Sequence, residues 1–143
     1  MSNTVTMLVV LLGLALSCCS QQIITERLFV TTKDGVELFT HIDRPNVTTP
    51  VKTLLERTPY GCVDAINYYW LQFGMAYVCQ EFRGKGRSKG NFTLFELEWS
   101  DAEDVIVYIT NQTWSNKDVR SYGGSAPGIA AYMEAISPIS RNV

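Results

Sequence analysis

The stretch that most restricts the fold is the nearly continuous apolar run at residues 75–82, MAYVCQEF. A strand that faces solvent on one side alternates apolar and polar residues, whereas a strand covered on both faces is apolar almost throughout. The run therefore predicts a strand inside a sheet that is covered on both sides. Helices on both faces of a mostly parallel sheet are typical of α/β proteins.

The segments around this run alternate between strand and helix patterns. The expected strands are residues 27–32, 36–42, 51–58, 75–82 and 118–122, and the expected helices are residues 64–73, a segment from residue 100 onward, and residues 126–136. This order predicts two antiparallel strands followed by strand–helix–strand–helix–strand–turn–helix. With 143 residues, 46% of them hydrophobic, the chain has enough apolar material for one domain with one core.

Two local signals support particular elements. Asp34-Gly35 between the first two strands is a strong hairpin signal. Ser100 and Glu103 have the spacing of a capping box, which predicts that the second helix begins at Ser100. A glycine-rich loop, RGKGRSKGN, separates the strand at 75–82 from this helix.

The first twenty residues differ in composition from the rest. MLVVLLGLAL, at 7–16, has the length of the apolar core of a signal peptide and is too short to span a bilayer. We expect a signal peptide at 1–20, cleaved after Ser17 or Ser20, and a single domain at 21–143. The alternative is an ordinary apolar helix at the start of the domain, and the absence of Lys and Arg before the run weakens the signal-peptide match.

Three N-x-[ST] sequons, at Asn46, Asn91 and Asn111, lie in expected loops or element ends. Together with the leader they favour a eukaryotic secretory route, which leads to the extracellular space or an endomembrane lumen. Cys62 and Cys79 remain after the leader. In an oxidising compartment they could pair, but the apolar run around Cys79 favours a buried free thiol at least as much, so the sequence does not predict the bond.

The segment SYGGSAPGIAA, at 121–131, predicts a strand that turns sharply into a helix with Ser125 at the apex. The nucleophile elbow of α/β hydrolases has the pattern G-x-S-x-G. Gly123 and Ser125 fit it, whereas Pro127 takes the position of the second glycine and Gly128 follows one residue later. Proline suits the first position of a helix and leaves the Ala126 N–H intact, although it disfavours helical geometry at the residue before it. The alternative is a tight turn with an inert serine.

Several segments together resemble the Xaa-Pro dipeptidyl-peptidases and cocaine-esterase-like acyl hydrolases of the α/β-hydrolase superfamily. The most specific are RTPYG, RGKGRSKGNF and YGGSAPGI, and they occur in the order found in that family. The resemblance covers nearly everything from about residue 28 onward. It implies the N-terminal part of an α/β-hydrolase fold, incomplete at its C-terminus and leaving an unpaired sheet edge where later strands belong.

The resemblance also implies roles for three residues. Ser125 matches the nucleophile that forms an acyl-enzyme, Tyr60 matches a tyrosine of the oxyanion hole, and Ala126 supplies the backbone N–H of that hole. Glu81 stands where the family usually has aspartate. The acid and the histidine of such a triad follow the serine in chain order, and no histidine follows Ser125 in this sequence.

The expected function is therefore that of a secreted serine hydrolase that cleaves an ester or amide, including an N-terminal X-Pro dipeptide, with this chain alone inactive. The alternative is a non-catalytic secreted glycoprotein that keeps the hydrolase scaffold. The expected partner is a small ester, amide or peptide substrate, with no nucleic acid, no membrane after signal cleavage, and no metal or cofactor. His41 is interpreted as a structural or surface residue, and the cations of the glycine-rich loop as solvated.

Overall fold

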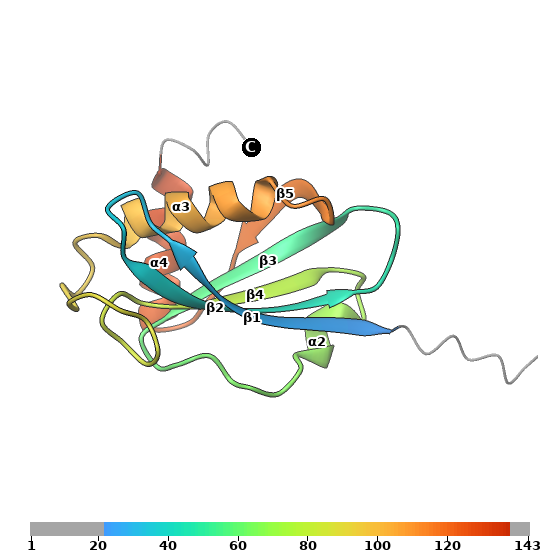
Figure 1. The fold of residues 1–143 in the computed structure, drawn as a ribbon, viewed down its shortest axis with the longest axis horizontal. Coiled ribbons are helices and arrows are strands. Elements are labelled where there is room, and N and C mark those ends of the chain that lie inside the picture. Colours follow the sequence, from blue (N-terminus) through green and yellow to red (C-terminus); the bar gives the residue numbers. More distant parts are fainter. Residues whose placement is uncertain (1–21, 138–143) are drawn as a thin grey trace, which may run out of the picture.

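The computed structural model describes residues 22–137, which form one sheet with helices packed against it (Figure 1). The strands are β1 (Ile23–Thr31), β2 (Glu37–Pro45), β3 (Val51–Thr58), β4 (Ala76–Glu81) and β5 (Ser115–Ser121). The helices are α2 (Tyr68–Leu71), α3 (Glu98–Thr110) and α4 (Ala126–Ile136). The predicted α/β class is confirmed, and the predicted leader lies outside the described residues.

The five strands lie in the order β1-β2-β4-β3-β5. β1 pairs antiparallel with β2, and β2 pairs antiparallel with β4, whereas β3 pairs parallel with both β4 and β5. The sheet is therefore mixed rather than mostly parallel. The difference arises at β2, which continues from the hairpin into an antiparallel pairing with the central strand.

The predicted hairpin is confirmed. Thr31 pairs with Glu37, and the turn between them contains Gly35 with a φ of +85°. Only glycine adopts this left-handed conformation without a steric penalty, which explains the Asp-Gly signal.

The predicted helix at 64–73 is largely wrong, because only Tyr68–Leu71 is helical. The backbone before it is held by side chains of other segments. The Asn67 N–H donates to the Asp43 carboxylate at 2.9 Å, and the Asp64 carbonyl accepts from Arg27 at 2.7 Å. Such contacts between distant segments leave no trace in local periodicity.

The predicted capping box is also wrong. Helix α3 begins at Glu98, so Ser100 already lies in its first turn. The Ser100 hydroxyl donates back to the Leu97 carbonyl at 2.9 Å instead of accepting from a backbone N–H.

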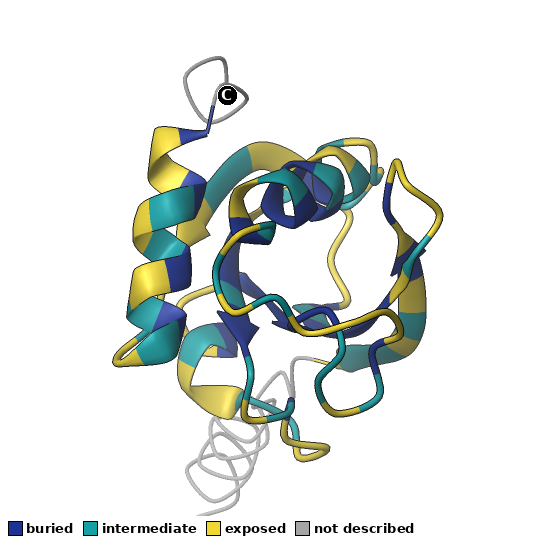
Figure 2. Cartoon of the chain, turned by 90° about the vertical axis from the view of Figure 1, so that its left-hand side faces the viewer, coloured by how far each residue is buried: buried dark blue, intermediate teal, exposed yellow. Residues whose placement is uncertain are grey.

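Every residue of β4 is buried, as its apolar run predicts. Val78 and Leu55 contribute to a core that includes Val105 and Ile109 of α3. Their neighbours Tyr77 and Leu54 face the other side of the sheet, in a second cluster with Phe39 and the two cysteines. Alternate residues of β3 and β4 therefore fill two separate cores, and buried residues of α4 also face the sheet (Figure 2).

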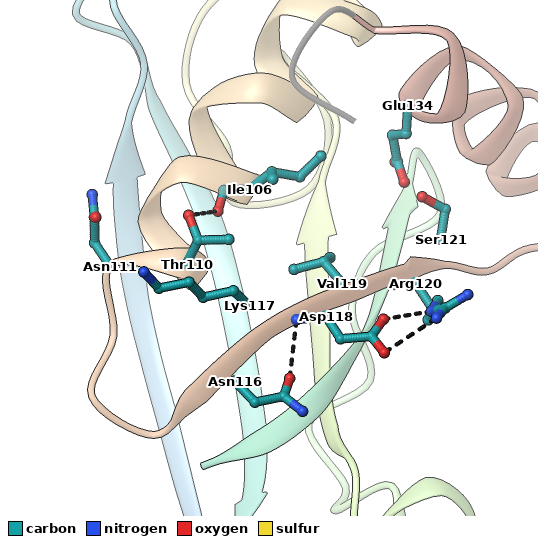
Figure 3. A pocket seen from close by; sticks show the side chains of 10 residues that line it. All are labelled: Ile106, Thr110, Asn111, Asn116, Lys117, Asp118, Val119, Arg120, Ser121 and Glu134. Carbon is teal, nitrogen blue, oxygen red and sulfur yellow. Dashed lines mark hydrogen bonds and ion pairs between the residues drawn. The ribbon is translucent and has the colours of Figure 1, made fainter. Parts of the chain in front are cut away.

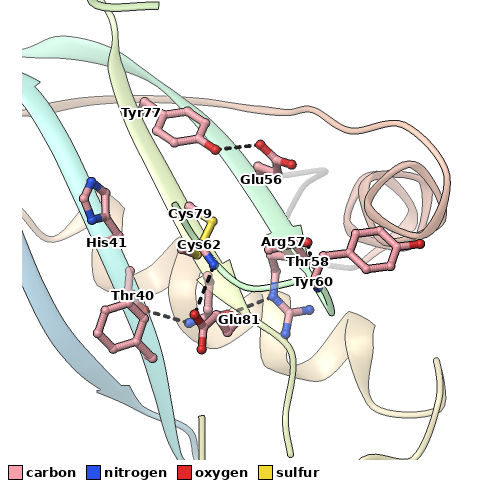
Figure 4. The surroundings of a disulfide bond; sticks show 12 residues. Thr40, His41, Glu56, Arg57, Thr58, Tyr60, Cys62, Tyr77, Cys79 and Glu81 are labelled. Atoms are coloured by element: carbon pink, nitrogen blue, oxygen red, sulfur yellow. Dashed lines mark hydrogen bonds between the residues drawn. A yellow bond between two sulfur atoms is a disulfide. The ribbon is translucent and has the colours of Figure 1, made fainter. Parts of the chain in front are cut away.

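Cys62 and Cys79 form a disulfide inside the second cluster (Figure 4). The alternative of a free buried thiol is wrong. The bond links the loop that follows β3 to the middle of the sheet.

Within the described residues, β5 pairs only with β3, so its outer edge is unpaired as expected. An open groove of about 830 Å³ runs along this edge (Figure 3). Lys117, Arg120 and the buried Glu134 are among the residues that line it, and neither Tyr60 nor Ser125 is. No helix in residues 22–137 has the length and apolar character needed to cross a membrane.

A buried cluster of charged groups connects the sheet to α3. Arg57, fully buried, donates to Gln80 at 2.8 Å and to the Glu98 carbonyl at 2.6 Å, and it lies 2.7 Å from the Glu98 carboxylate. Removal from water disfavours a carboxylate, so burial raises the pKa of Glu98 to about 7, although Arg57 acts in the opposite direction.

This raised pKa predicts how stability depends on pH. Between the ordinary value of 4.5 and about 7, the folded state holds a proton on Glu98 that the unfolded state has lost. Glu98 therefore contributes stability that is complete below pH 4.5 and lost as the pH rises through about 7. Denaturant unfolding from pH 5 to 8 should show a less negative slope of unfolding free energy against pH in Glu98→Gln than in the wild type. The exposed Glu96→Gln variant should keep the wild-type slope, and equal slopes in all three proteins would contradict the assignment.

Candidate functional site

Ser125 stands at the junction of β5 and α4 with a φ of 59° and a ψ of −129°. A positive φ is strained for a residue with a side chain, at a cost of about 1–3 kcal/mol, and such residues cluster at functional sites. The side chain is exposed, and the Ser125 carbonyl accepts the Ile129 N–H at 3.1 Å in the first turn of α4. The predicted strand–turn–helix is therefore present, with Ser125 at its apex.

Two glycines allow the turn to close. A Cβ on Gly123 would lie 2.5 Å from the Pro127 carbonyl oxygen, and a Cβ on Gly128 would lie 3.1 Å from the Gly123 oxygen. Gly128 therefore allows the backbone to pass close to Gly123, one position later than the second glycine of G-x-S-x-G. A Cβ on Gly124, by contrast, would meet nothing within 4 Å.

Proline at 127 fits this turn, as predicted. Pro127 lies in the first turn of α4, where its missing N–H would have no partner within the helix. Although proline disfavours helical geometry at the residue before it, Ala126 is the first residue of α4. Ala126 keeps its N–H directly after the serine.

Tyr60, in the loop after β3, lies next to Ser125. Its hydroxyl is 3.3 Å from Ser125 Oγ, although 65 residues separate the two in sequence. Tyr60 is 71% exposed, and its ring extends toward α4 (Figure 4). The structure therefore brings together the three residues singled out from the sequence, Tyr60, Ser125 and Ala126.

This arrangement contains a nucleophile and the hydrogen-bond donors of an oxyanion hole, which are two of the requirements of acyl transfer. A hydroxyl is held at an exposed apex, a helix begins beside it, and a phenol can donate a hydrogen bond at the same place. Unpaired N–H groups at a helix N-terminus and a side-chain donor together can stabilise the oxygen of a tetrahedral intermediate.

His41 lies within the sheet, away from this arrangement. It is 1% exposed on β2, and its Nε2 lies 3.0 Å from the Asp43 carboxylate. The interpretation as a structural residue is confirmed, and the surface alternative is wrong.

The expectation that the cations of the glycine-rich loop are solvated is wrong for Arg83. Arg83 is 7% exposed and binds Asp34 at 2.7 Å and the buried Asp101. Arg87 binds Glu81 and Asp64, each at 2.7 Å. Both arginines are therefore paired with carboxylates of the protein. Among residues 22–137, no group of three or more His, Cys, Asp or Glu side chains is arranged to hold a metal ion.

Glu81 is a residue whose part in the site the sequence did not reveal. Its side chain is almost fully buried and accepts the Cys62 N–H at 3.0 Å. From the sequence, Glu81 differs from the family only in replacing an aspartate. A charged residue at the end of an otherwise apolar strand, followed by a cationic loop, is a signal that could have suggested this ion pair.

Residues 34–140 match the model of the X-Pro dipeptidyl-peptidase (S15) family. The chain belongs to this family. It is 32% identical over 124 residues to the cocaine esterase of Rhodococcus sp. (strain MB1 Bresler), a match that covers 81% of this chain and 22% of that protein.

Solved structures agree on the fold. An α-amino acid ester hydrolase matches with a TM-score of 0.73 and 24% identity over 84% of this chain and 24% of that one. A CocE/NonD family hydrolase from Staphylococcus aureus also has a TM-score of 0.73, with 22% identity over 80% of this chain and 26% of that one. The mixed sheet is therefore that of an α/β hydrolase, and this S15 chain spans about a quarter of the length of these structures.

The packing of the turn predicts that alanine destabilises the protein at one of its two adjacent glycines and not at the other. Gly123→Ala should lower the free energy of unfolding by about 1–3 kcal/mol or more, because the added methyl group overlaps Pro127. Gly124→Ala, where the methyl group enters open space, should change it by less than about 0.5 kcal/mol. Chemical denaturation of both variants measures the difference, and equal losses would contradict the described turn.

Proposed function

We propose that Ser125 is the nucleophile of a serine hydrolase that cleaves an ester or amide through an acyl-enzyme. The observation that carries this proposal is the strained, exposed Ser125 with the Tyr60 hydroxyl 3.3 Å from its Oγ. Strained backbone conformations of this kind cluster at active sites. Membership of the S15 family supports the same chemistry.

In the proposed reaction, Ser125 Oγ attacks the carbonyl carbon of the substrate and loses its proton to a general base. The carbonyl oxygen gains negative charge and accepts hydrogen bonds from the Tyr60 hydroxyl and the Ala126 N–H. The tetrahedral intermediate then collapses and expels the alcohol or amine, which leaves an ester on Ser125. A single donor of this kind contributes about 10²–10³-fold to kcat.

We place the general base outside this sequence. His41, the one histidine of the chain, is buried against Asp43. A serine without its base loses most of its activation. This chain alone is therefore proposed to be inactive, and to contribute the nucleophile and the oxyanion hole to a site that other residues complete.

The substrate class follows from the family and its relatives. Cocaine esterase and α-amino acid ester hydrolase are named for esters, and the S15 family for X-Pro dipeptides. We propose a small ester, an amide or an N-terminal X-Pro peptide as the substrate, with no metal or organic cofactor in the reaction.

A secretory route is proposed on separate grounds. Asn46, Asn91 and Asn111 are all exposed, which would let glycans attach without disturbing the core. The disulfide between Cys62 and Cys79 suits an oxidising compartment. Both features support the signal peptide expected at residues 1–20.

Fluorophosphonate labelling of the complete protein that carries these residues tests the nucleophile. The labelled peptide should contain Ser125, and Ser125→Ala should abolish the label. Tyr60→Phe should slow labelling by about 10²–10³-fold through loss of an oxyanion donor. Tyr68→Phe, at another exposed tyrosine, should leave the rate unchanged.

Label that persists in Ser125→Ala would overturn the assignment of the nucleophile. A folded protein in which Ser125 does not react at all would instead support the alternative of a non-catalytic glycoprotein built on the hydrolase scaffold.

A further inference from the structure

The Tyr60 ring is not held by packing. With 71% of the residue exposed, its hydroxyl contacts Ser125 while its backbone N–H donates to the Thr58 hydroxyl at 3.1 Å. A side chain that is not enclosed takes its position from the backbone that carries it. The loop after β3 must therefore determine where the phenol lies.

That loop is fixed at Cys62, two residues beyond Tyr60. The Cys62 side chain is bonded to Cys79, which lies in the fully buried strand β4. The Cys62 N–H donates to Glu81 Oε1 at 3.0 Å, and the Cys62 carbonyl accepts from Arg87 Nη2 at 2.7 Å. The side chain, the donor and the acceptor of one residue are thus all engaged, and Figure 4 shows the first two of these contacts.

The pair that holds the Cys62 backbone is itself firmly built. Arg87 donates through Nε at 3.0 Å and through Nη2 at 2.7 Å to Glu81 Oε1, and its backbone N–H donates to Glu81 Oε2. Burial opposes the charge on Glu81, but the hydrogen bonds from Arg87 and Cys62 outweigh it and hold the pKa of Glu81 below its usual range. The Arg87 guanidinium also lies over the Phe39 ring, 3.7 Å from its centre.

A single residue, Gly61, separates this anchor from Tyr60. Its φ of +92° is a conformation that other residues rarely adopt, and it sets the direction in which the chain leaves Cys62. On the other side, Tyr60 follows Thr58 and Pro59 at the end of β3, where the Thr58 carbonyl accepts the Phe82 N–H at 2.9 Å. Tyr60 is therefore held between two fixed points.

We propose that the Cys62–Cys79 disulfide and the Glu81–Arg87 ion pair are positioning groups for Tyr60, and that they hold its hydroxyl at Ser125. The effect on catalysis rests on the function proposed above, in which Tyr60 donates to the oxyanion. Because that hydrogen bond strengthens in the transition state, loss of the anchor lowers kcat and leaves KM nearly unchanged.

A double-mutant cycle on the complete protein tests whether the disulfide acts through Tyr60. Cys62→Ser/Cys79→Ser should lower kcat for a p-nitrophenyl ester by about tenfold or more, up to the loss seen in Tyr60→Phe. In the Tyr60→Phe background the same cysteine changes should cost less than about twofold, since the group they position is already gone. Equal losses in both backgrounds would show a general structural role and overturn the inference.

Arg87→Gln can replace the cysteine changes in this cycle, and it breaks no covalent bond. If the cysteine variant fails to fold, the losses of kcat in Arg87→Gln test the inference instead. Its side chain is partly exposed, and the substitution removes the hydrogen bond to the Cys62 carbonyl while the disulfide stays in place. Arg120→Gln, at an exposed ion pair with Asp118 on β5, should leave kcat unchanged in both backgrounds.

NMR separates this inference from the proposed function. Nuclear Overhauser effects between the Tyr60 ring and the Ser125 β-protons should be present in the wild type and weakened in Cys62→Ser/Cys79→Ser and Arg87→Gln. Their persistence at full strength in both variants would overturn the positioning role. Their loss, together with a Tyr60→Phe variant of undiminished kcat, would support the positioning role and count against the catalytic role of Tyr60.

Discussion

The parallel pairing of β3 with β5 brings the two ends of the candidate site together. Parallel neighbours release their following loops at the same edge of a sheet, so Tyr60 after β3 and Ser125 after β5 emerge side by side. On the other side of β3, β4 pairs with it in parallel and ends at Glu81. Glu81 and its partner Arg87 therefore lie at this same edge, where they bind the Cys62 backbone. A different order or direction of these three strands would separate groups that now touch.

The two cores and the buried charges keep this edge rigid. Alternate residues of β3 and β4 pack into opposite clusters, so neither strand can shift by one residue without exchanging its faces. The Arg57 side chain of β3 lies in the charged cluster between the sheet and α3, where it donates hydrogen bonds to Gln80 and Glu98. Removing Arg57 would leave the buried Glu98 carboxylate without its cation, which is more costly than losing a surface ion pair. The strain at Ser125 can persist because the structure around it is fixed in this way.

The sequence was informative where one residue type meets one local requirement. Asp34-Gly35 predicted the hairpin, the run at 75–82 predicted the buried strand, and Ser125 between a strand and a helix predicted the elbow. Two local patterns gave wrong predictions, a helix over residues 64–67 and a capping box at Ser100. Contacts with Asp43 and Arg27 in the first case, and with the Leu97 carbonyl in the second, overrode the local pattern. The disulfide, the pairing of β2 with β4 and the burial of Arg83 depend on residues far apart in sequence, which local reasoning cannot bring together. Tyr60 became a candidate through family resemblance alone.

The crystal structure of a phosphonate adduct of the complete protein would test the central claim most directly. The account predicts that phosphorus is bonded to Ser125 Oγ and that a non-bridging oxygen lies about 2.7–3.1 Å from both the Tyr60 hydroxyl and the Ala126 nitrogen. Phosphorus bonded to another side chain, or an oxygen that accepts from neither donor, would contradict it.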